Sequence, residues 1–199
     1  MNRRISVKCL VLPGGSPLYQ GKKNDAGWDA STRAIVSTDF DETTAYARKI
    51  IYGFDKPTDS HADHVRWNND HYEYLLLPGE TVNIGLGIIL AMRTNTVAVT
   101  VARRGSTALK DIELIHEPDI PEYISDGMHN VFIDENFRGE PIARIRNQGR
   151  EAFPIWHSRR IIQIGFFRNI VQPQFSIITD FSKLGMTNRD TKCNGSSGH

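Results

Sequence analysis

The stretch Val131–Asn147 reads VFIDENFRGEPIARIRN, and it decides the fold class. A short apolar run leads to the carboxylate of Asp134 and then to a polar turn that ends at Gly139. After the turn, apolar Ala143 and Ile145 alternate with arginines. Alternation with a period of two on either side of a glycine-bearing turn predicts a β-hairpin. Asp134 itself is either a turn former that bonds its own backbone or a carboxylate presented for chemistry.

Outward from this stretch, the chain is a series of short apolar runs separated by Gly and Pro turns. Strands are predicted over 5–12, 74–77, 81–92, 97–102, 152–156, 160–167 and 175–181. Residues 39–54 fit either a short helix capped by an acid or a strand, and residues 24–31 are predicted as a loop plugged by Trp28. Gln163 lies inside an apolar strand, where an amide needs a partner. The pattern predicts an all-β fold, a distorted barrel or jelly roll with at most one or two short helices.

Composition narrows the classes of function. The 199 residues carry 24 basic and 23 acidic side chains, a formal net charge of +1, so nothing global attracts nucleic acid or an anionic membrane. Cys9 and Cys193 match no metal or redox spacing and are expected to be free thiols in a reducing compartment. No apolar run has the length of a signal peptide or a membrane span. We therefore expect a cytoplasmic protein with neither nucleic-acid nor membrane partners.

Three local patterns have competing interpretations. His61, His64 and His71 have metal-like spacing, but no fourth ligand accompanies them, so residues 55–72 are predicted to be a solvated loop. The sequence RRGST at 103–107 is either an anion cradle or an exposed basic turn. The Gly/Ser-rich end, 187–199, is either a disordered tail or a mobile arm.

Five stretches occur in an order that is informative when they are taken together. They are DAGWDA at 25–30, RRGSTALK at 103–110, IDENFRGE at 133–140, RIIQI at 160–164, and Arg189 followed by GSSG at 195–198. In order and spacing they resemble the five motifs of the trimeric dUTPase family, within the dUTPase and dCTP deaminase superfamily. The resemblance predicts a barrel domain over 1–186, with insertions near 39–72 and 111–126, and a flexible C-terminal arm over 187–199 that closes over the active site.

The resemblance implies a homotrimer with shared active sites that hydrolyses dUTP to dUMP and pyrophosphate with Mg²⁺. Asp134 would activate the attacking water, Asp29 would support the metal through water, and Phe137 would pack on the deoxyribose. The residues expected to bind substrate are Arg104, Gly105, Ser106, Asn130, Val131, Ile133, Phe137, Gln163, Arg189, Asn194, Gly195, Ser196 and Ser197. A phage or other viral origin, with the host cytoplasm as location, would suit so divergent a member.

Departures from the motifs leave the substrate open. Gly105 replaces a Ser, Val131 replaces a Gly, and Asn194 stands where the family has an aromatic residue that stacks on uracil. Loss of such a stack costs on the order of 1–3 kcal/mol. The same chemistry on dCTP or a 5-modified dUTP, or a non-catalytic binding protein on this scaffold, remain alternatives. Arg144 stands where the deaminases have their catalytic Glu, which argues against dCTP deamination.

Overall fold

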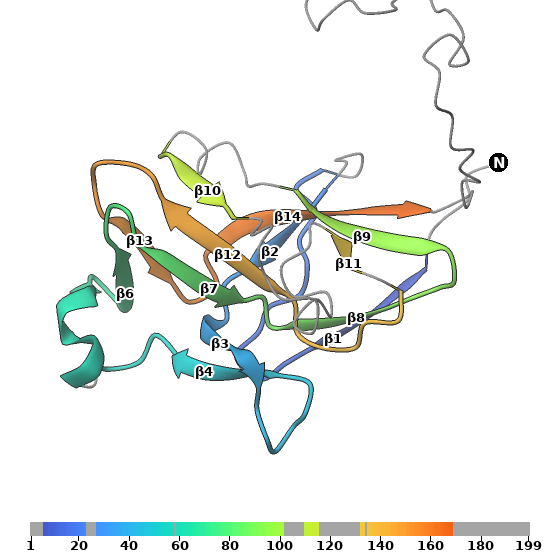
Figure 1. Ribbon diagram of the computed structural model, residues 1–199, viewed down its shortest axis with the longest axis horizontal. Helices are drawn as coiled ribbons and strands as arrows, with labels where there is room; N and C mark the ends of the chain where they lie inside the picture. Colours follow the sequence, from blue (N-terminus) through green and yellow to red (C-terminus); the bar gives the residue numbers. More distant parts are fainter. Residues whose placement is uncertain are drawn as a thin grey trace, which may run out of the picture. The chain divides into compact units, whose positions relative to one another are not determined.

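The structure is a computed structural model that describes residues 6–22, 27–57, 59–101, 110–115, 132–133 and 135–168, with the backbone alone at 59, 60, 101 and 132. These residues form antiparallel strands and one 3₁₀ helix (Figure 1). The elements are β1 (Val7–Val11), β2 (Trp28–Ser31), β3 (Ala34–Phe40), β4 (Arg48–Tyr52), η1 (Asp59–His64), β5 (Val65–Asn68), β6 (His71–Leu76), β7 (Thr81–Gly85), β8 (Ile88–Met92), β9 (Thr96–Val101), β10 (Ile112–Leu114), β11 (Phe132–Ile133), β12 (Ile142–Asn147), β13 (Phe153–Trp156) and β14 (Arg160–Arg168). The all-β fold class is confirmed.

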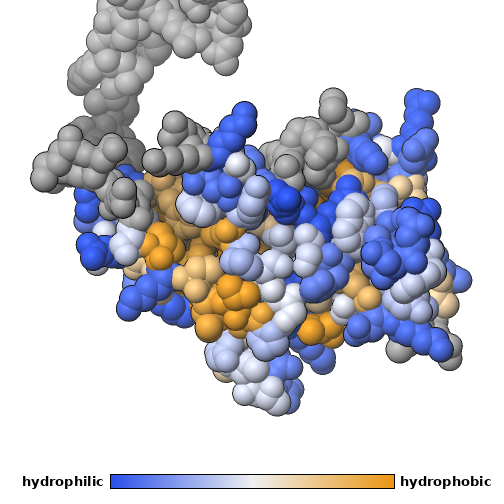
Figure 2. Space-filling model, turned by 180° about the vertical axis from the view of Figure 1, so that it is seen from behind, coloured by the Kyte–Doolittle hydropathy of each residue, from blue (hydrophilic) through white to orange (hydrophobic). Residues whose placement is uncertain are grey.

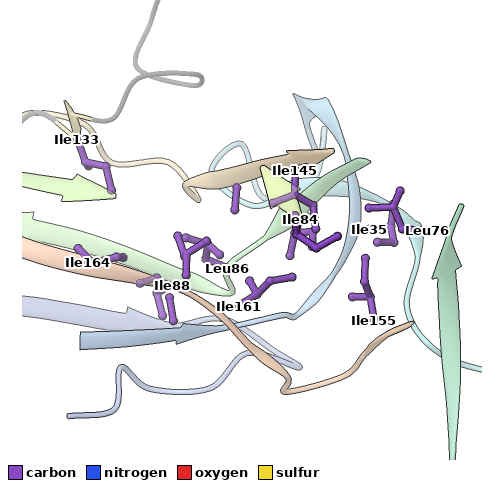
Figure 3. Packing of buried hydrophobic residues seen from close by; sticks show 14 of the residues in the cluster. Ile35, Leu76, Ile84, Leu86, Ile88, Ile133, Ile145, Ile155, Ile161 and Ile164 are labelled. Atoms are coloured by element: carbon purple, nitrogen blue, oxygen red, sulfur yellow. The ribbon is translucent and has the colours of Figure 1, made fainter. Parts of the chain in front are cut away.

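The strands pair in four sheets. Their orders are β1-β8, β10-β12-β7-β3-β4, β11-β9-β14-β2 and β13-β6-β5. Side chains from all four sheets meet in one apolar cluster, because the strands alternate apolar and polar residues and turn the apolar ones inward. Figure 3 shows how Ile84 and Ile145, from neighbouring strands, lie beside Leu86 and Ile161 in this core.

The alternation after Gly139 is confirmed, but the hairpin is not. Ala143 and Ile145 are buried in the core, whereas Arg146 is exposed. However, β11 pairs with β9, and β12 pairs with β7 and β10, so the two strands belong to different sheets. Period-two alternation reports which face of a strand is buried; it does not report which strand is the neighbour.

Other boundaries also differ from the predictions. The apolar run 81–92 is two strands, because the chain turns at Gly87, where φ is +64°. Of the two predictions for residues 39–54, the helix is wrong and the strand is confirmed. Asp41 Oδ1 accepts the amides of Thr43 and Thr44, as a helix cap would. No helix follows, because Ala45 has φ +55° and the chain turns into β4.

Three regions predicted to be loops contain regular elements. Residues 55–72 hold η1, β5 and the start of β6, the start of the 111–126 excursion forms β10, and the end of 24–31 forms β2. Trp28 is 36% exposed rather than buried as a plug. The predicted strand at 175–181 and the boundary at 186 lie outside the described residues and stay predictions.

Glu140, which is fully buried, fastens three segments together. Its Oε1 accepts Arg33 Nε at 2.7 Å and the Gly87 amide at 2.8 Å. Its Oε2 accepts Arg33 Nη2 at 2.6 Å and the Arg48 amide at 2.8 Å. Four donors, two of them on a buried arginine, satisfy both oxygens, which is the condition under which a buried charge is tolerated.

Two loops cross at a pair of glycines beside this carboxylate. A Cβ built on Gly87 would lie 2.6 Å from the Cα of Gly15, and a Cβ on Gly15 would lie 2.2 Å from the Gly87 carbonyl oxygen. Both positions therefore require glycine for close backbone approach, and Gly87 requires it for its positive φ as well.

The structure describes one of the two cysteines. Cys9 is a free thiol, and partial burial raises its pKa; Cys193 lies outside the described residues. Within the described part of the chain, no helix is long and apolar enough to cross a membrane. Figure 2 shows apolar side chains gathered on one face of the molecule.

Candidate functional site

Asp29 and Gln163 face each other across neighbouring strands. The register of β2 and β14 places them directly opposite, and Gln163 Nε2 donates to Asp29 Oδ1 at 3.1 Å. Asp29 is only 4% exposed. Gly27 leaves room for the amide, since a Cβ there would lie 3.3 Å from Gln163 Oε1. The hydrogen-bond partner that the sequence predicted for Gln163 is therefore Asp29, which is itself a predicted site residue.

A cation completes the surroundings of this carboxylate. Arg160 Nη1 lies 3.4 Å from Asp29 Oδ2, and the Arg160 guanidinium stacks 4.2 Å from the centroid of the Tyr19 ring. Tyr19 in turn exchanges two backbone hydrogen bonds with Asp29, at 2.7 and 3.0 Å. The two side-chain donors, together with the backbone bonds to Tyr19, hold the Asp29 carboxylate in one orientation.

The end of β9 lies beside the same pair. In the order β9-β14-β2, Val101 is opposite Gln163, which is opposite Asp29. The RRGST segment begins two residues after Val101 in the sequence. The register therefore brings the chain to the Asp29–Gln163 pair just before Arg104, although residues 102–109 lie outside the described part.

Ile133 lies farther away in the same sheet. It pairs with Ala98, three residues along β9 from Val101, and β11 is three strands from β2. At about 3.3 Å per residue and about 4.8 Å per strand, Ile133 is roughly 10 Å along and 14 Å across the sheet from Asp29. The Ile133 side chain is buried in the core, so only its backbone is available to a ligand.

Residues Glu135–Gly139 form a turn that we call the third-motif turn. The residue before it, Asp134, lies outside the described part of the chain. Phe137 is partly buried and packs against the apolar core. A Cβ on Gly139 would lie 2.5 Å from Phe40 Cζ and 2.8 Å from Phe137 Cζ, so both rings press on this glycine. Arg138 donates to the backbone carbonyls of Glu135 and Phe137 and fastens the turn from outside.

Most of the remaining predicted site residues fall outside the described part of the chain. They are Asp134, Arg104, Gly105, Ser106, Asn130, Val131, Arg189, Asn194, Gly195, Ser196 and Ser197. Two contributors were not predicted: Arg160 opens the fourth motif and Glu140 closes the third, but neither was given a role. The sequence feature that could have indicated both residues is an ionisable side chain at the end of an apolar run, where burial would require a partner of opposite charge.

The three histidines of 55–72 have separate partners. His61 stacks on Tyr52, His64 Nε2 lies 2.9 Å from Glu80 Oε1, and His71 Nδ1 lies 2.7 Å from Asp70 Oδ1. The bond to Asp70 raises the pKa of His71. Among the described residues, no group of three His, Cys, Asp or Glu side chains could hold a metal ion.

A cleft of about 580 Å³ is also present, between β4 and the β5–β6 turn. Its lining includes Arg33, Ile50, Trp67, Tyr72 and His157. It includes none of the residues predicted to bind substrate or metal. The cleft is therefore separate from the Asp29–Gln163 pair.

The fold is that of dUTPases. Among solved structures, a dUTPase of Staphylococcus bacteriophage 80alpha with the nucleotide analogue dUpNHpp matches with a TM-score of 0.57 and 15% identity, over 98% of this chain and 99% of that one. A dUTPase from phage phi11 of S. aureus, described with a structural Mg(II) ion, matches with a TM-score of 0.55 and 12% identity, over 89% and 99%. No family model matches the sequence, and no curated protein matches it.

Proposed function

We propose that the protein is a pyrimidine deoxynucleoside triphosphate diphosphatase that hydrolyses dUTP to dUMP and pyrophosphate. The observation that supports this most is the alignment of Val101, Gln163 and Asp29 across three strands. It brings the first and fourth stretches of the family resemblance together, beside the strand that precedes the second stretch in the sequence. The fold is shared with phage dUTPases, one of which was solved with dUpNHpp, and this likeness supports a nucleotide site in the protein.

In this proposal each side chain has a defined task. Asp134 orients and deprotonates the water that attacks the α-phosphorus, a general-base contribution of about 10²–10⁴-fold. Arg104, Ser106 and Gln163 bind phosphate oxygens, and the Phe137 ring packs on the deoxyribose, where it excludes a 2′-hydroxyl. The arm brings Arg189, Ser196 and Ser197 to the phosphates and closes the site to water.

The residues present fit a hydrated magnesium ion. Mg²⁺ retains several waters and is bound through one or two carboxylates together with substrate phosphates. Asp29 is a buried carboxylate beside Gln163 and Arg160, and carboxylate oxygen is a ligand type that Mg²⁺ accepts. Asp29 would hold the ion through water. When bound, the ion would supply charge neutralisation on the triphosphate, which a protein of net charge +1 does not supply globally.

The proposal includes a homotrimer with shared sites. Ile133, which precedes Asp134, is roughly 17 Å from Asp29 in one chain on ideal sheet spacings, too far for both carboxylates to serve one triphosphate end. A second subunit that contributes the third-motif turn would remove this gap. Light scattering at several concentrations tests the assembly, and a stable monomer that retains full activity would contradict it.

The decisive experiment is a substrate panel. Each deoxynucleoside triphosphate, together with UTP and a 5-modified dUTP, is incubated with Mg²⁺ while monophosphate, pyrophosphate and ammonia are resolved. Pyrophosphate mainly from dUTP supports the proposal. Release mainly from dCTP or the modified nucleotide keeps the chemistry and reassigns the base, an alternative favoured by Asn194 at the stacking position.

The matched variant for this panel is Asp134→Asn. It should bind dUpNHpp with nearly the parent's affinity and lose most turnover, by about 10²-fold or more. Full activity in this variant would refute the assigned mechanism. If the parent binds dUpNHpp and yields no product from any nucleotide, the protein is a non-catalytic nucleotide-binding member of the fold.

A further inference from the structure

The loop Asp41–Ala47 between β3 and β4, here called the β3–β4 loop, lies against the third-motif turn. The amide of Glu140 donates to the Tyr46 carbonyl oxygen at 2.8 Å. Arg48, just after the loop, donates from its amide to Glu140 Oε2 at 2.8 Å and from Nε to the Glu140 carbonyl oxygen at 3.1 Å. Arg48 is 1% exposed, so these bonds are formed away from solvent.

Phe40, at the other end of the loop, contacts the turn directly. Its ring presses on Gly139, at the position that a Cβ would occupy, from the same space that Phe137 reaches. The Arg48 guanidinium stacks on the Phe40 ring at 3.6 Å from the centroid. Arg48 therefore holds Phe40, and Phe40 together with Glu140 holds the end of the turn.

The β3–β4 loop has internal bonds that make it rigid enough for this role. Asp41 Oδ1 accepts the amides of Thr43 and Thr44 at 3.0 and 3.2 Å. The amide of Asp41 donates to the Ala47 carbonyl oxygen at 2.8 Å, and Arg48 Nη1 donates to the Thr38 carbonyl oxygen at 2.6 Å. A contact can position a neighbouring turn only if its own partners are fixed.

We propose that Phe40 and Arg48 are positioning residues for the third-motif turn, and that the segment inserted after β3 serves to fix this turn, which carries Phe137 and directly follows Asp134 in the sequence. This inference rests on the proposed function. Both residues act through Gly139 and Glu140 and do not touch the nucleotide. A displacement of about 1 Å at a catalytic group costs on the order of 10²-fold in rate.

The test compares two phenylalanines of the same segment. Phe40→Ala removes the ring that presses on Gly139, whereas Phe54→Ala removes a ring buried in the core beside Tyr52. For each variant, kcat, KM, the preference for dUTP over UTP, and hydrogen exchange of the peptide covering 135–140 are measured well below the melting temperature.

Phe40→Ala should lower kcat by about 10–100-fold, reduce the preference for dUTP over UTP and accelerate exchange in 135–140. Phe54→Ala should lower the melting temperature without these three effects. Equal effects of the two alanine variants, or unchanged exchange in Phe40→Ala, would overturn the inference. If the parent hydrolyses no nucleotide, the proposed function fails, and the exchange rates alone decide whether Phe40 positions the turn.

Discussion

The Arg33–Glu140 pair gives a sharp prediction about stability. In Glu140→Gln, one carboxylate oxygen is kept as the amide oxygen and still accepts hydrogen bonds. The other is replaced by an NH₂ group, which points at two N–H donors. Whichever way the amide is turned, two of the four hydrogen bonds to this carboxylate are lost, and Arg33, 6% exposed, keeps an uncompensated charge. The loss of two charge-assisted hydrogen bonds at about 1.5–3 kcal/mol each amounts to about 3–6 kcal/mol. This agrees with the usual cost of breaking a buried ion pair, about 3–5 kcal/mol.

We therefore expect the free energy of unfolding to fall by about 3–5 kcal/mol, and the melting temperature by about 6–20 °C for a chain of this length. Urea unfolding followed by tryptophan fluorescence and by circular dichroism, at one fixed protein concentration, measures the change. The matched control is Glu113→Gln on β10, an exposed carboxylate bonded to Gln148, which should change stability by less than about 0.5 kcal/mol.

The double variant Arg33→Met with Glu140→Leu separates charge from hydrogen bonding. It removes the two charges of the Arg33–Glu140 pair but leaves the amides of Gly87 and Arg48 without the acceptor. It should therefore recover only part of the loss seen in Glu140→Gln. A Glu140→Gln protein within about 1 kcal/mol of the parent would refute the view that this carboxylate joins the three segments.

Three further results are expected. Gly87→Ala should cost about 2–4 kcal/mol, because its Cβ meets backbone, whereas Gly79→Ala, with φ +82° and open space, should cost only about 1–2 kcal/mol; equal losses in urea unfolding would contradict the glycine crossing. The bond to Asp70 raises the pKa of His71, so the stabilisation of the folded protein by this bond is complete below the ordinary histidine pKa of 6.5 and is lost as the pH rises through the folded pKa. NMR titration should show that the pKa of His71 falls in Asp70→Asn, and an unchanged pKa would exclude the bond. Deletion of Arg189–His199 should cripple turnover while the melting temperature barely moves, and undiminished hydrolysis would disprove the arm's role.

The sequence was informative where a local pattern has a local cause. Alternation predicted correctly that Ala143 and Ile145 are buried, and the polar amide of Gln163 in an apolar strand correctly indicated a partner. The all-β class followed from the repetition of short strands between Gly and Pro turns. These features depend on burial and turn geometry, which neighbouring residues determine.

Features that depend on distant residues were not predictable in the same way. The pairing of β11 with β9 and of β12 with β7 decides that there is no hairpin, and nothing in Val131–Asn147 encodes it. The Arg33–Glu140 pair joins residues 107 apart. Asp41 begins a cap that would start a helix, yet the tertiary contacts of Arg48 and Phe40 require a strand there.

The distance in sequence between Asp29 and Gln163 has a consequence for synthesis. The two residues are 134 positions apart. In the described sheets β2 is an edge strand, and the strand next to it is β14. At about 5–20 residues per second, a ribosome needs on the order of ten seconds to deliver β14 after β2 has emerged. During that interval the edge of β2 that will pair with β14 is open to other chains. Nascent chains stalled before residue 160 should therefore be the aggregation-prone species, and folding of the released chain should be slow, as long-range strand pairing requires.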